Sequence, residues 1–381
     1  MSEKPLRVCY FGTYRAEYSR NTSMIAALRT QGVEVIECHV PLWHGIEDRV
    51  QAASGGWRSP TFWARVLRTY LRLLRRYRAC KTYDVLMVGY PGQFDVFLAW
   101  MLARLRGKPL VWDVFMSVYL VALERGLDAR SKFTIGLLRR IERLALRLPD
   151  LLIQDTAAYV DWLHKTHGIP KERFRLVPTG ADDRIFRAQH PPQRESGFLV
   201  LYYGTFIPNH GVRHIIEAAR HLQSHPEIHF ELIGQGPEQP MACQLVREYG
   251  LENVTFIDWM EKPTLVERIA AADVCLGAFG TTPQSLMTVQ NKIYEGLAMA
   301  KPVLTGDGPA VRDALQHGVH VYLVPREDGA ALAEGILALQ RDSALRARLS
   351  REGHRIFKAR YGLDALGRQT LAHLQEVMHG R

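Results

Sequence analysis

The chain has 381 residues, of which 47% are hydrophobic and 23% are charged, so wholesale disorder and fibrous repeats are excluded. At about 150 residues per domain, this length suggests two or three domains. The formal net charge is +10, and all of the basic excess lies in the first half. Residues 1–190 carry 30 Lys and Arg against 18 Asp and Glu, whereas residues 191–381 carry 19 against 21. We therefore expect an anionic partner for the first half.

The apolar segments indicate a cytoplasmic protein without a membrane span. Asp113 interrupts the best candidate span, Pro109–Leu123, which is shorter than the roughly 18 residues required. The polar start, Met1–Arg7, does not have the pattern of a secretory signal. The five cysteines show no CxxC or metal-ligand spacing, so we expect reduced thiols and no metal.

Short apolar runs alternate with segments of helical period along nearly the whole chain, which predicts parallel strands buried on both faces. The strands expected in the first half are Leu6–Phe11, Val33–His39, Asp84–Val88, Pro109–Trp112, Asp150–Gln154 and Phe174–Val177. The strands expected in the second half are Phe198–Tyr203, His229–Ile233, Val254–Ile257, Val274–Ala278, Pro302–Thr305 and Val319–Val324. This alternation predicts an α/β protein with two Rossmann-like, doubly wound sheets.

A polar segment with two prolines, Arg187–Gly197, separates the two sets and is the expected linker. We therefore predict an N-terminal domain over 1–187 and a C-terminal domain over 188–362. The segment 363–381 is expected to be a helix that packs across the hinge. The two sheets would face each other across a cleft.

Ligands of open parallel sheets bind beyond the carboxyl ends of the strands, which singles out the loops that follow them. Gly204 and Thr205 follow one strand, and a helix begins near Gly211. Backbone amides at such a helix start can hold a phosphate. A turn that binds no ligand is an equal alternative. Gly234 and Gly236 follow the next strand. The same rule adds five more residues to the candidate donor-binding residues: Trp259, Met260, Phe279, Gly280 and Asn291.

Lys292 and Glu295, in NKIYEGLAMAKPVL, are three residues apart and share one helix face. A lysine there can neutralise a phosphate, and a carboxylate can accept both hydroxyls of a ribose. A surface ion pair worth a few tenths of a kcal/mol is the alternative.

Four motifs in order resemble the retaining glycosyltransferases of family 4, which have the GT-B fold. They are VPTGADDRIF, YYGTFIPNHGV, AADVCLGAF and NKIYEGLAMAKPVL. The likeness is close from about Arg173 to Asp313 and only architectural in the first half. It implies that the second half binds a nucleotide sugar and that the first half binds an acceptor.

In that family a pair of glutamates eight positions apart brackets the helix start. The second glutamate contacts the ribose and matches Glu295, whereas the first would fall at Met287. The basic phosphate-binding residues of the family fall at or near Thr205 and His210. The resemblance therefore implies a divergent member in which Lys292 contacts the diphosphate and His210 is a second donor.

The first half offers a loop, Gly12–Thr13, that would approach the donor phosphates from the other side. Arg20 lies in the same region, and we expect it to be solvated. Asp113 directly follows a strand, where a carboxylate would meet the acceptor hydroxyl; its alternative is a helix N-cap. Asp155 and Thr156 have the same two interpretations, with the cap favoured.

The segment from Phe62 to Tyr77 is strongly amphipathic, and no acidic residue lies between Asp48 and Asp84. At 100° per residue its apolar side chains cover one half of a helix, and the arginines cover the other. We favour docking on an anionic membrane, in which each arginine contributes about 1 kcal/mol and an aromatic residue sits at the interface. A plain solvated face and nucleic acid are the alternatives, and aromatic residues for base stacking are not evident. The residues assigned to the membrane are Trp63, Arg65, Arg68, Arg72, Arg75 and Arg76.

We therefore expect a glycosyltransferase that moves a sugar from a UDP- or GDP-sugar to a lipid-linked or glycan acceptor at the inner membrane surface. The resemblance implies retention of configuration without a metal or other cofactor. Lys292, Glu295 and Asp113 are the candidate catalytic residues. Two alternatives remain open: an epimerase or hydrolase of the same fold, and a non-catalytic nucleotide-sugar-binding protein.

Overall fold

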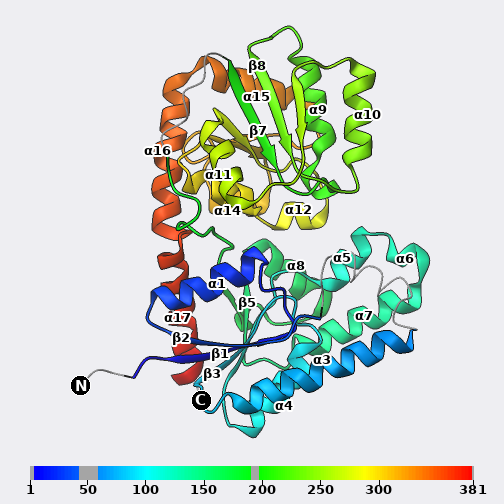
Figure 1. Ribbon diagram of the computed structural model, residues 1–381, viewed down its shortest axis with the longest axis vertical. Coiled ribbons are helices and arrows are strands. Elements are labelled where there is room, and N and C mark those ends of the chain that lie inside the picture. The colour runs from blue at the N-terminus through cyan, green and yellow to red at the C-terminus, as the bar shows by residue number, and fades with distance from the viewer. Residues whose placement is uncertain (1–3, 43–58, 190–196, 380–381) are drawn as a thin grey trace. The chain divides into compact units, whose positions relative to one another are not determined.

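The structure, a computed structural model, describes residues 4–42, 59–189 and 197–379 (Figure 1). All the expected strands are confirmed, and they form two parallel six-stranded sheets. The first sheet contains β1 (Arg7–Gly12), β2 (Glu34–His39), β3 (Val85–Val88), β4 (Leu110–Asp113), β5 (Leu151–Gln154) and β6 (Phe174–Leu176). The second contains β7 (Phe198–Tyr203), β8 (Ile228–Ile233), β9 (Val254–Ile257), β10 (Val274–Leu276), β11 (Val303–Gly306) and β12 (Tyr322–Val324).

Helices connect the strands, as buried parallel sheets require. Those of the first unit are α1 (Ser19–Thr30), α3 (Pro60–Ala79), α4 (Asp95–Leu105), α5 (Val118–Glu124), α6 (Leu127–Arg130), α7 (Lys132–Ala145), α8 (Ala157–His167) and α17 (Leu363–His379). Those of the second unit are α9 (Val212–His221), α10 (Gln239–Tyr249), α11 (Lys262–Ala271), α12 (Pro283–Met287), α13 (Asn291–Ala298), α14 (Pro309–Ala314), α15 (Gly329–Arg341) and α16 (Ser343–Arg360).

The strand orders are β2-β1-β3-β4-β5-β6 and β12-β11-β10-β7-β8-β9. Each sheet reverses its winding direction once, between β1 and β3 in the first sheet and between β7 and β10 in the second. Ligands of such sheets bind at these reversals. The topology therefore points to the loops after β7 and β10.

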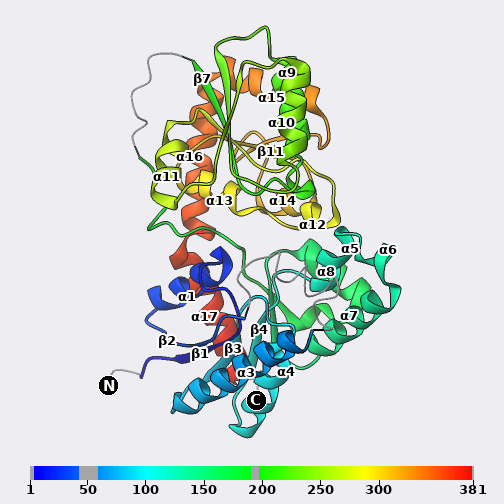
Figure 2. The same ribbon diagram turned by 45° about the vertical axis from the view of Figure 1, so that its right-hand side comes forward.

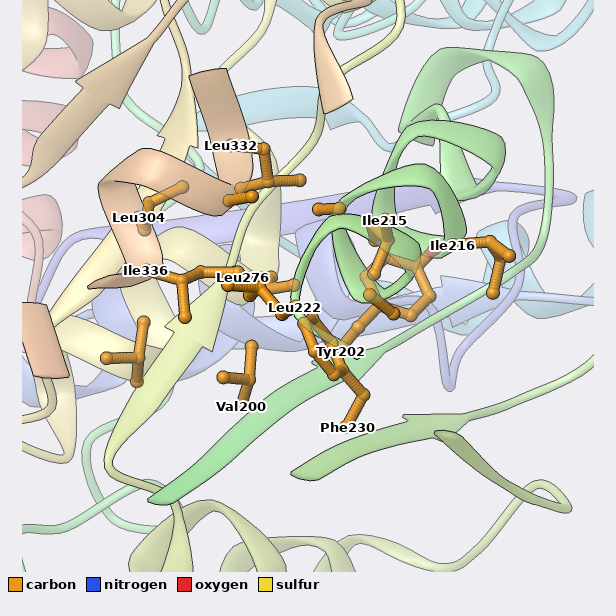
Figure 3. Close-up of a cluster of buried hydrophobic side chains, with 14 of the residues drawn as sticks. Val200, Tyr202, Ile215, Ile216, Leu222, Phe230, Leu276, Leu304, Leu332 and Ile336 are labelled. Atoms are coloured by element: carbon orange, nitrogen blue, oxygen red, sulfur yellow. The ribbon is translucent and has the colours of Figure 1, made fainter. Parts of the chain in front are cut away.

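The core of the second unit forms between its sheet and the helices on one face (Figure 3). Val200 and Phe230 of the sheet pack with Ile215 of α9 and Ile336 of α15, and all four side chains are buried. Helix α10 lies beside α9 in both views of the fold (Figures 1 and 2). On the other face, α13 packs on β10 and β11 and also contacts α16. The sheet thus holds α13 firmly at its carboxyl edge.

The first unit includes α17, which lies along α1 (Figure 2). Leu366 and Leu374 of α17 share a buried cluster with Met24 of α1. The two helices approach closely at Gly367, where an added Cβ would lie 2.2 Å from the carbonyl oxygen of Ala27. This helix therefore completes the core of the first unit.

The contacts divide the chain into residues 1–178 with 363–381, and residues 179–362. The boundary lies at 178/179 rather than at 187/188, because the segment after Pro178 contacts the second unit: the Ala181 amide donates to the Tyr361 carbonyl at 3.2 Å. Most of the expected linker, 187–197, falls outside the described residues.

None of the helices in the described residues is long and apolar enough to span a bilayer.

Candidate functional site

The loops at the carboxyl edge of the second sheet pack backbone against backbone, and glycines make this possible. Gly204 and Gly234 have φ values of +141° and +130°, which strain any residue with a side chain. An added Cβ at Gly234 would lie 2.1 Å from the Gly204 carbonyl oxygen, and one at Gly236 would lie 2.6 Å from the Phe206 nitrogen. Gly234 and Gly236 are therefore required for loop packing, whatever they bind.

Gly204 differs from Gly234 and Gly236 because an added Cβ would meet a lysine side chain rather than the backbone. An added Cβ there would lie 2.9 Å from Nζ of Lys292. Lys292 is the second residue of α13, and its side chain is only 5% exposed. Its Nζ lies 3.2 Å from Nδ1 of His210 and 4.2 Å from the centre of the Tyr202 ring. Among the described residues, no carboxylate oxygen lies within 4 Å of this nitrogen.

Burial lowers the pKa of Lys292 to about 7, although attraction to Glu295 opposes the shift. Removing an ammonium group from water is costly unless a partner of opposite charge compensates it. The ammonium form of this lysine is therefore stabilised by an arriving anion. This is the electrostatic signature of an anion site.

His210 is fixed beside the lysine as a neutral ring. Its Nδ1 lies 2.6 Å from the Thr205 carbonyl oxygen and 2.9 Å from the Tyr202 hydroxyl. Burial and the nearby Lys292 hold the pKa of His210 well below its usual value. Since Nδ1 donates to the carbonyl, a neutral ring has no second N–H for a phosphate. This geometry argues against His210 as the second phosphate donor that we expected.

Glu295 lies one helical turn beyond Lys292 and is partly buried. Burial raises the pKa of its carboxyl to about 7, while a hydrogen bond from Tyr203 and the charges of Lys262 and Lys292 oppose the shift. The Tyr203 hydroxyl also donates to the Lys292 carbonyl at 3.1 Å. We refer to Tyr202, Tyr203, His210, Lys292 and Glu295 as the Lys292 cluster. It combines a buried cation and a nearby carboxyl at the point where the sheet reverses.

Arg326 fixes the loop that borders this cluster, and sequence reasoning missed it. Its guanidinium donates to the carbonyl of Gly280 at 2.8 Å and to Oγ of Ser285 at 3.0 Å. Ser285 in turn donates to the Asn209 carbonyl at 2.6 Å, which ties the loop after β10 to the loop after β7. The signal was present, because Arg326 stands just after β12, at the same edge of the sheet.

The remaining predicted donor residues lie around the same edge. Phe279 is buried, and its amide donates to the His210 carbonyl at 2.9 Å. Trp259, after β9, is 63% exposed, and Met260 is partly buried. Asn291 begins α13 and is partly exposed. Met287, where the resemblance puts the first glutamate, is buried at the end of α12.

In the first unit, the Gly12–Thr13 loop is held by a buried carboxylate. Asp95 accepts the Thr13 amide at 2.7 Å and the Tyr70 hydroxyl at 2.8 Å. Burial raises the pKa of Asp95 to about 6, and these hydrogen bonds oppose the shift. An added Cβ at Gly12 would lie 2.7 Å from the same carboxylate. The Thr13 N–H is therefore engaged by Asp95, although we expected this loop to approach the donor phosphates.

Asp113 is fully buried and bound by Arg20 in a bidentate ion pair. Arg20 donates through Nε and Nη2 at 2.8 Å each, and its Nη1 donates to the carbonyls of Val177 and Pro178. We expected Arg20 to be solvated; this expectation was wrong, because the side chain is buried. Asp113 is not an N-cap either, because Ser117 caps α5. Since both its oxygens are engaged and it has no exposed surface, Asp113 fits a structural role better than the catalytic role that we predicted.

Asp155 lies close to this pair. Burial raises its pKa to about 7, although attraction to Arg20 opposes the shift. Thr156 caps α8, so the cap interpretation favoured for this pair of residues is confirmed for Thr156.

The predicted amphipathic helix is confirmed as α3, but its apolar half is only partly buried. Thr69, Leu73 and Tyr77 are buried. Trp63, Leu67 and Leu71 are 56%, 61% and 48% exposed. The exposed apolar stripe runs beside the exposed arginines, which are Arg65, Arg68, Arg72, Arg75, Arg76 and Arg78.

A groove of about 690 Å³ opens along α3. Its lining is Val40, Pro41, Leu42, Arg65, Thr69, Arg72, Arg75 and Arg76. This groove therefore combines four guanidinium groups with apolar walls, which suits an anionic, partly apolar ligand.

Three cysteines that are distant in sequence come together in the first unit. The Sγ atoms of Cys9, Cys38 and Cys80 lie within 4.8 Å of one another, and all three residues are buried. The spacing along the chain gave no sign of this arrangement.

The chain matches known protein families over most of its length. Residues 7–180 match the family described as Glycosyl transferase 4-like domain. Residues 197–342 match the family described as Glycosyl transferases group 1. A curated relative, the alpha-D-kanosaminyltransferase of Streptomyces kanamyceticus, is 25% identical over 297 residues, which are 74% of this chain and 74% of the relative.

Solved structures share the fold over the whole chain. Sucrose-phosphate synthase from Thermosynechococcus elongatus has a TM-score of 0.74 and 17% identity, with 100% of both chains covered. Anabaena HepE, solved in complex with UDP, has a TM-score of 0.70 and 16% identity, and the match covers 98% of this chain and 100% of HepE. HepE has also been solved with UDP-glucose.

Proposed function

Since the chain is a glycosyltransferase of the GT-B fold, we propose that it transfers a sugar from a nucleotide-sugar donor to a lipid-linked or glycan acceptor at a membrane surface. The second unit binds the donor, and the first unit binds the acceptor. The observation that carries the proposal is the buried ammonium of Lys292, which lies over Gly204 with no carboxylate within 4 Å among the described residues.

The donor diphosphate is the natural partner of this ammonium. It brings the negative charge that the buried site lacks, and the amides at the start of α13 add donors to it. The Glu295 carboxylate accepts the two ribose hydroxyls. The structures of HepE with UDP and with UDP-glucose support a nucleotide sugar as the donor class.

In the reaction, the bond between the anomeric carbon and the donor phosphate oxygen breaks, and a bond to the acceptor oxygen forms. Negative charge grows on the departing nucleotide diphosphate, where Lys292 and the amides stabilise it. We propose retention of configuration, in which the acceptor proton passes to the donor phosphate. This route needs neither a metal nor an enzyme nucleophile. The Tyr202 ring, 4.2 Å from Nζ, keeps the ammonium in place.

The acceptor end is proposed from the surface of α3. An exposed apolar stripe beside a row of arginines matches an anionic bilayer surface, in which apolar side chains enter the interface and guanidinium groups meet phosphates. The groove along α3 offers four arginines to the phosphates of a lipid-linked acceptor. We propose that this surface docks on the inner face of the cell membrane.

The donor assignment is tested by thermal unfolding with UDP, GDP, ADP, dTDP and CMP. A nucleotide at 100 times its dissociation constant stabilises the protein by about 2.7 kcal/mol, so one nucleotide class is expected to raise the melting temperature. Glu295→Ala should abolish this rise while leaving the unliganded melting temperature close to that of the wild type. An equal rise in wild type and variant would refute the ribose assignment.

The reaction is tested by release of the nucleotide diphosphate from the donor that this screen identifies. We expect release to depend on an added lipid-linked or glycan acceptor. Full-rate release without acceptor would instead indicate a hydrolase, and conversion of the donor sugar without release would indicate an epimerase. Tight donor binding with no turnover on any acceptor would indicate a non-catalytic binding protein.

The membrane proposal is tested by co-sedimentation with anionic and zwitterionic vesicles. Reversal of Arg65, Arg68, Arg72 and Arg75 to glutamate should weaken binding to anionic vesicles at least about 100-fold, at about 1 kcal/mol per arginine. A matched control reverses Arg341, Arg348, Arg351 and Arg355, which are exposed on the second unit and carry the same charge. Equal loss in both variants would show that only net charge matters.

A further inference from the structure

Cys9, Cys38 and Cys80 come from three different elements and point to one place. Cys9 lies in β1 and Cys38 in the neighbouring β2, and Cys80 directly follows α3. Cys38 pairs in register with Phe11, two residues beyond Cys9, so Cys9 and Cys38 lie on the same face of the sheet. Helix α3 covers this face, because the Cys38 thiol contacts the Leu73 carbonyl at 3.9 Å.

The sulfur positions suit a single metal ion. Metal–thiolate bonds are about 2.3 Å for zinc, which puts three ligand sulfurs roughly 4 Å apart around one ion. The three Sγ atoms already lie within 4.8 Å of one another. Closing the site therefore requires a shift of less than about 1 Å. The carbonyl oxygen of Arg76, in the last turn of α3, accepts from the Cys80 thiol at 3.5 Å and therefore lies next to the site.

The charge near the three cysteines is compatible with a divalent ion. Three thiolates around a divalent ion carry one net negative charge, which a buried site must compensate. Arg106 supplies a positive charge, since its guanidinium donates to the Cys80 carbonyl at 2.7 Å and stacks 4.4 Å from the centre of the Tyr77 ring.

We propose that Cys9, Cys38 and Cys80 bind one soft divalent d¹⁰ cation, such as Zn²⁺, through three thiolates. Cys80 is 9% exposed and the other two are at most 1% exposed, so the ion enters from the Cys80 side. Bound there, the ion ties the end of α3 to β1 and β2. This proposal stands independently of the glycosyl transfer reaction.

The test uses Cd²⁺ as the probe with the reduced, metal-free full-length protein. Titration should produce a thiolate-to-cadmium absorption band in the ultraviolet that saturates at one ion per chain. Cys80→Ser removes the most exposed ligand and should weaken binding by more than the roughly 10- to 100-fold that loss of an outer partner costs. Cys275→Ala is the matched control, because Cys275 is also a buried cysteine but lies in the second unit.

Melting temperature gives a second readout. Cd²⁺ should raise the melting temperature of the wild type and of Cys275→Ala, but not that of Cys80→Ser. If Cys80→Ser fails to fold, Cys38→Ala takes its place in both measurements. No band in the wild type, or the same band in Cys80→Ser and Cys38→Ala, would overturn the proposal. Equal loss in Cys275→Ala would do so as well.

Discussion

Both sheets have buried charged side chains in the loops at their carboxyl edges, but the groups that surround these charges differ. At the edge of the second sheet, Lys292 is buried beside an imidazole and an aromatic ring. At the edge of the first sheet, Asp113 is buried in a bidentate pair with Arg20, and Asp95 is held by Thr13 and Tyr70. Removing one member of an existing pair leaves the other charge buried alone, whereas a buried cation without a nearby carboxylate is available to an anionic ligand. Asp155 of the first sheet edge is also buried, and its pKa is raised to about 7, but a carboxyl group does not attract an anion. The comparison therefore favours the second sheet edge for an anionic ligand.

The largest expected effect comes from breaking the pair in the first unit. Asp113→Ala leaves the Arg20 charge buried without a partner, which should cost about 3 to 5 kcal/mol of unfolding free energy. Urea denaturation measures this loss. The double variant Arg20→Met with Asp113→Leu should recover much of it, because neither charge remains. A loss below about 1 kcal/mol for Asp113→Ala would contradict the structural role of the pair.

In contrast to Asp113→Ala, Lys292→Met should weaken ligand binding without destabilising the fold. The fold loses a buried charge without a partner, so the unfolding free energy should stay the same or rise. Nucleotide diphosphate affinity should fall by about 2 kcal/mol, roughly 30-fold, because one charge-assisted hydrogen bond is lost. Calorimetric titration measures the affinity, and urea denaturation measures the stability. Destabilisation with unchanged affinity would place Lys292 among the structural charges.

Donor affinity should be greatest near pH 7 and fall on both sides. Glu295, with a pKa raised to about 7, must be ionised to accept ribose hydroxyls, so affinity falls below pH 7. Lys292, with a pKa lowered to about 7, must be protonated to hold the diphosphate, so affinity falls above pH 7. Each limb should approach about tenfold per pH unit. Calorimetry from pH 5 to 9 measures both limbs, and a flat profile would disprove the pairing; Lys292→Met should lose only the alkaline limb.

The smallest effect should come from an exposed pair. Arg213 and Glu217 form an i,i+4 ion pair on α9, and Arg213 is 59% exposed. Arg213→Ala should cost no more than about 0.5 kcal/mol of unfolding free energy. Urea denaturation of Arg213→Ala and Asp113→Ala under the same conditions compares the two losses of unfolding free energy. A cost similar to that of Asp113→Ala would show that burial is not what separates the two pairs.

The strands and the helix of Lys292 were predictable because apolar runs and helical spacing are local signals. Lys292 and Glu295 share a face because they are three residues apart, which needs no tertiary information. The pairing of Arg20 with Asp113 was missed because the two residues are 93 positions apart and only the sheet order brings them together. The same holds for Cys9, Cys38 and Cys80, and for Arg326 with Gly280. Helical periodicity also placed Leu67 and Leu73 on one apolar half, but it does not say which of them meets the sheet.

Helix α17 also determines when the first unit can fold during synthesis. Its leucines cover α1, so residues 1–178 alone would leave Met24 and its neighbours exposed to water. The ribosome makes residues 179–362 before α17, and these residues form a continuous unit with its own core. The second unit can therefore fold while the first still waits for its last helix. A ribosome-bound chain that lacks α17 would present the α1 surface to chaperones.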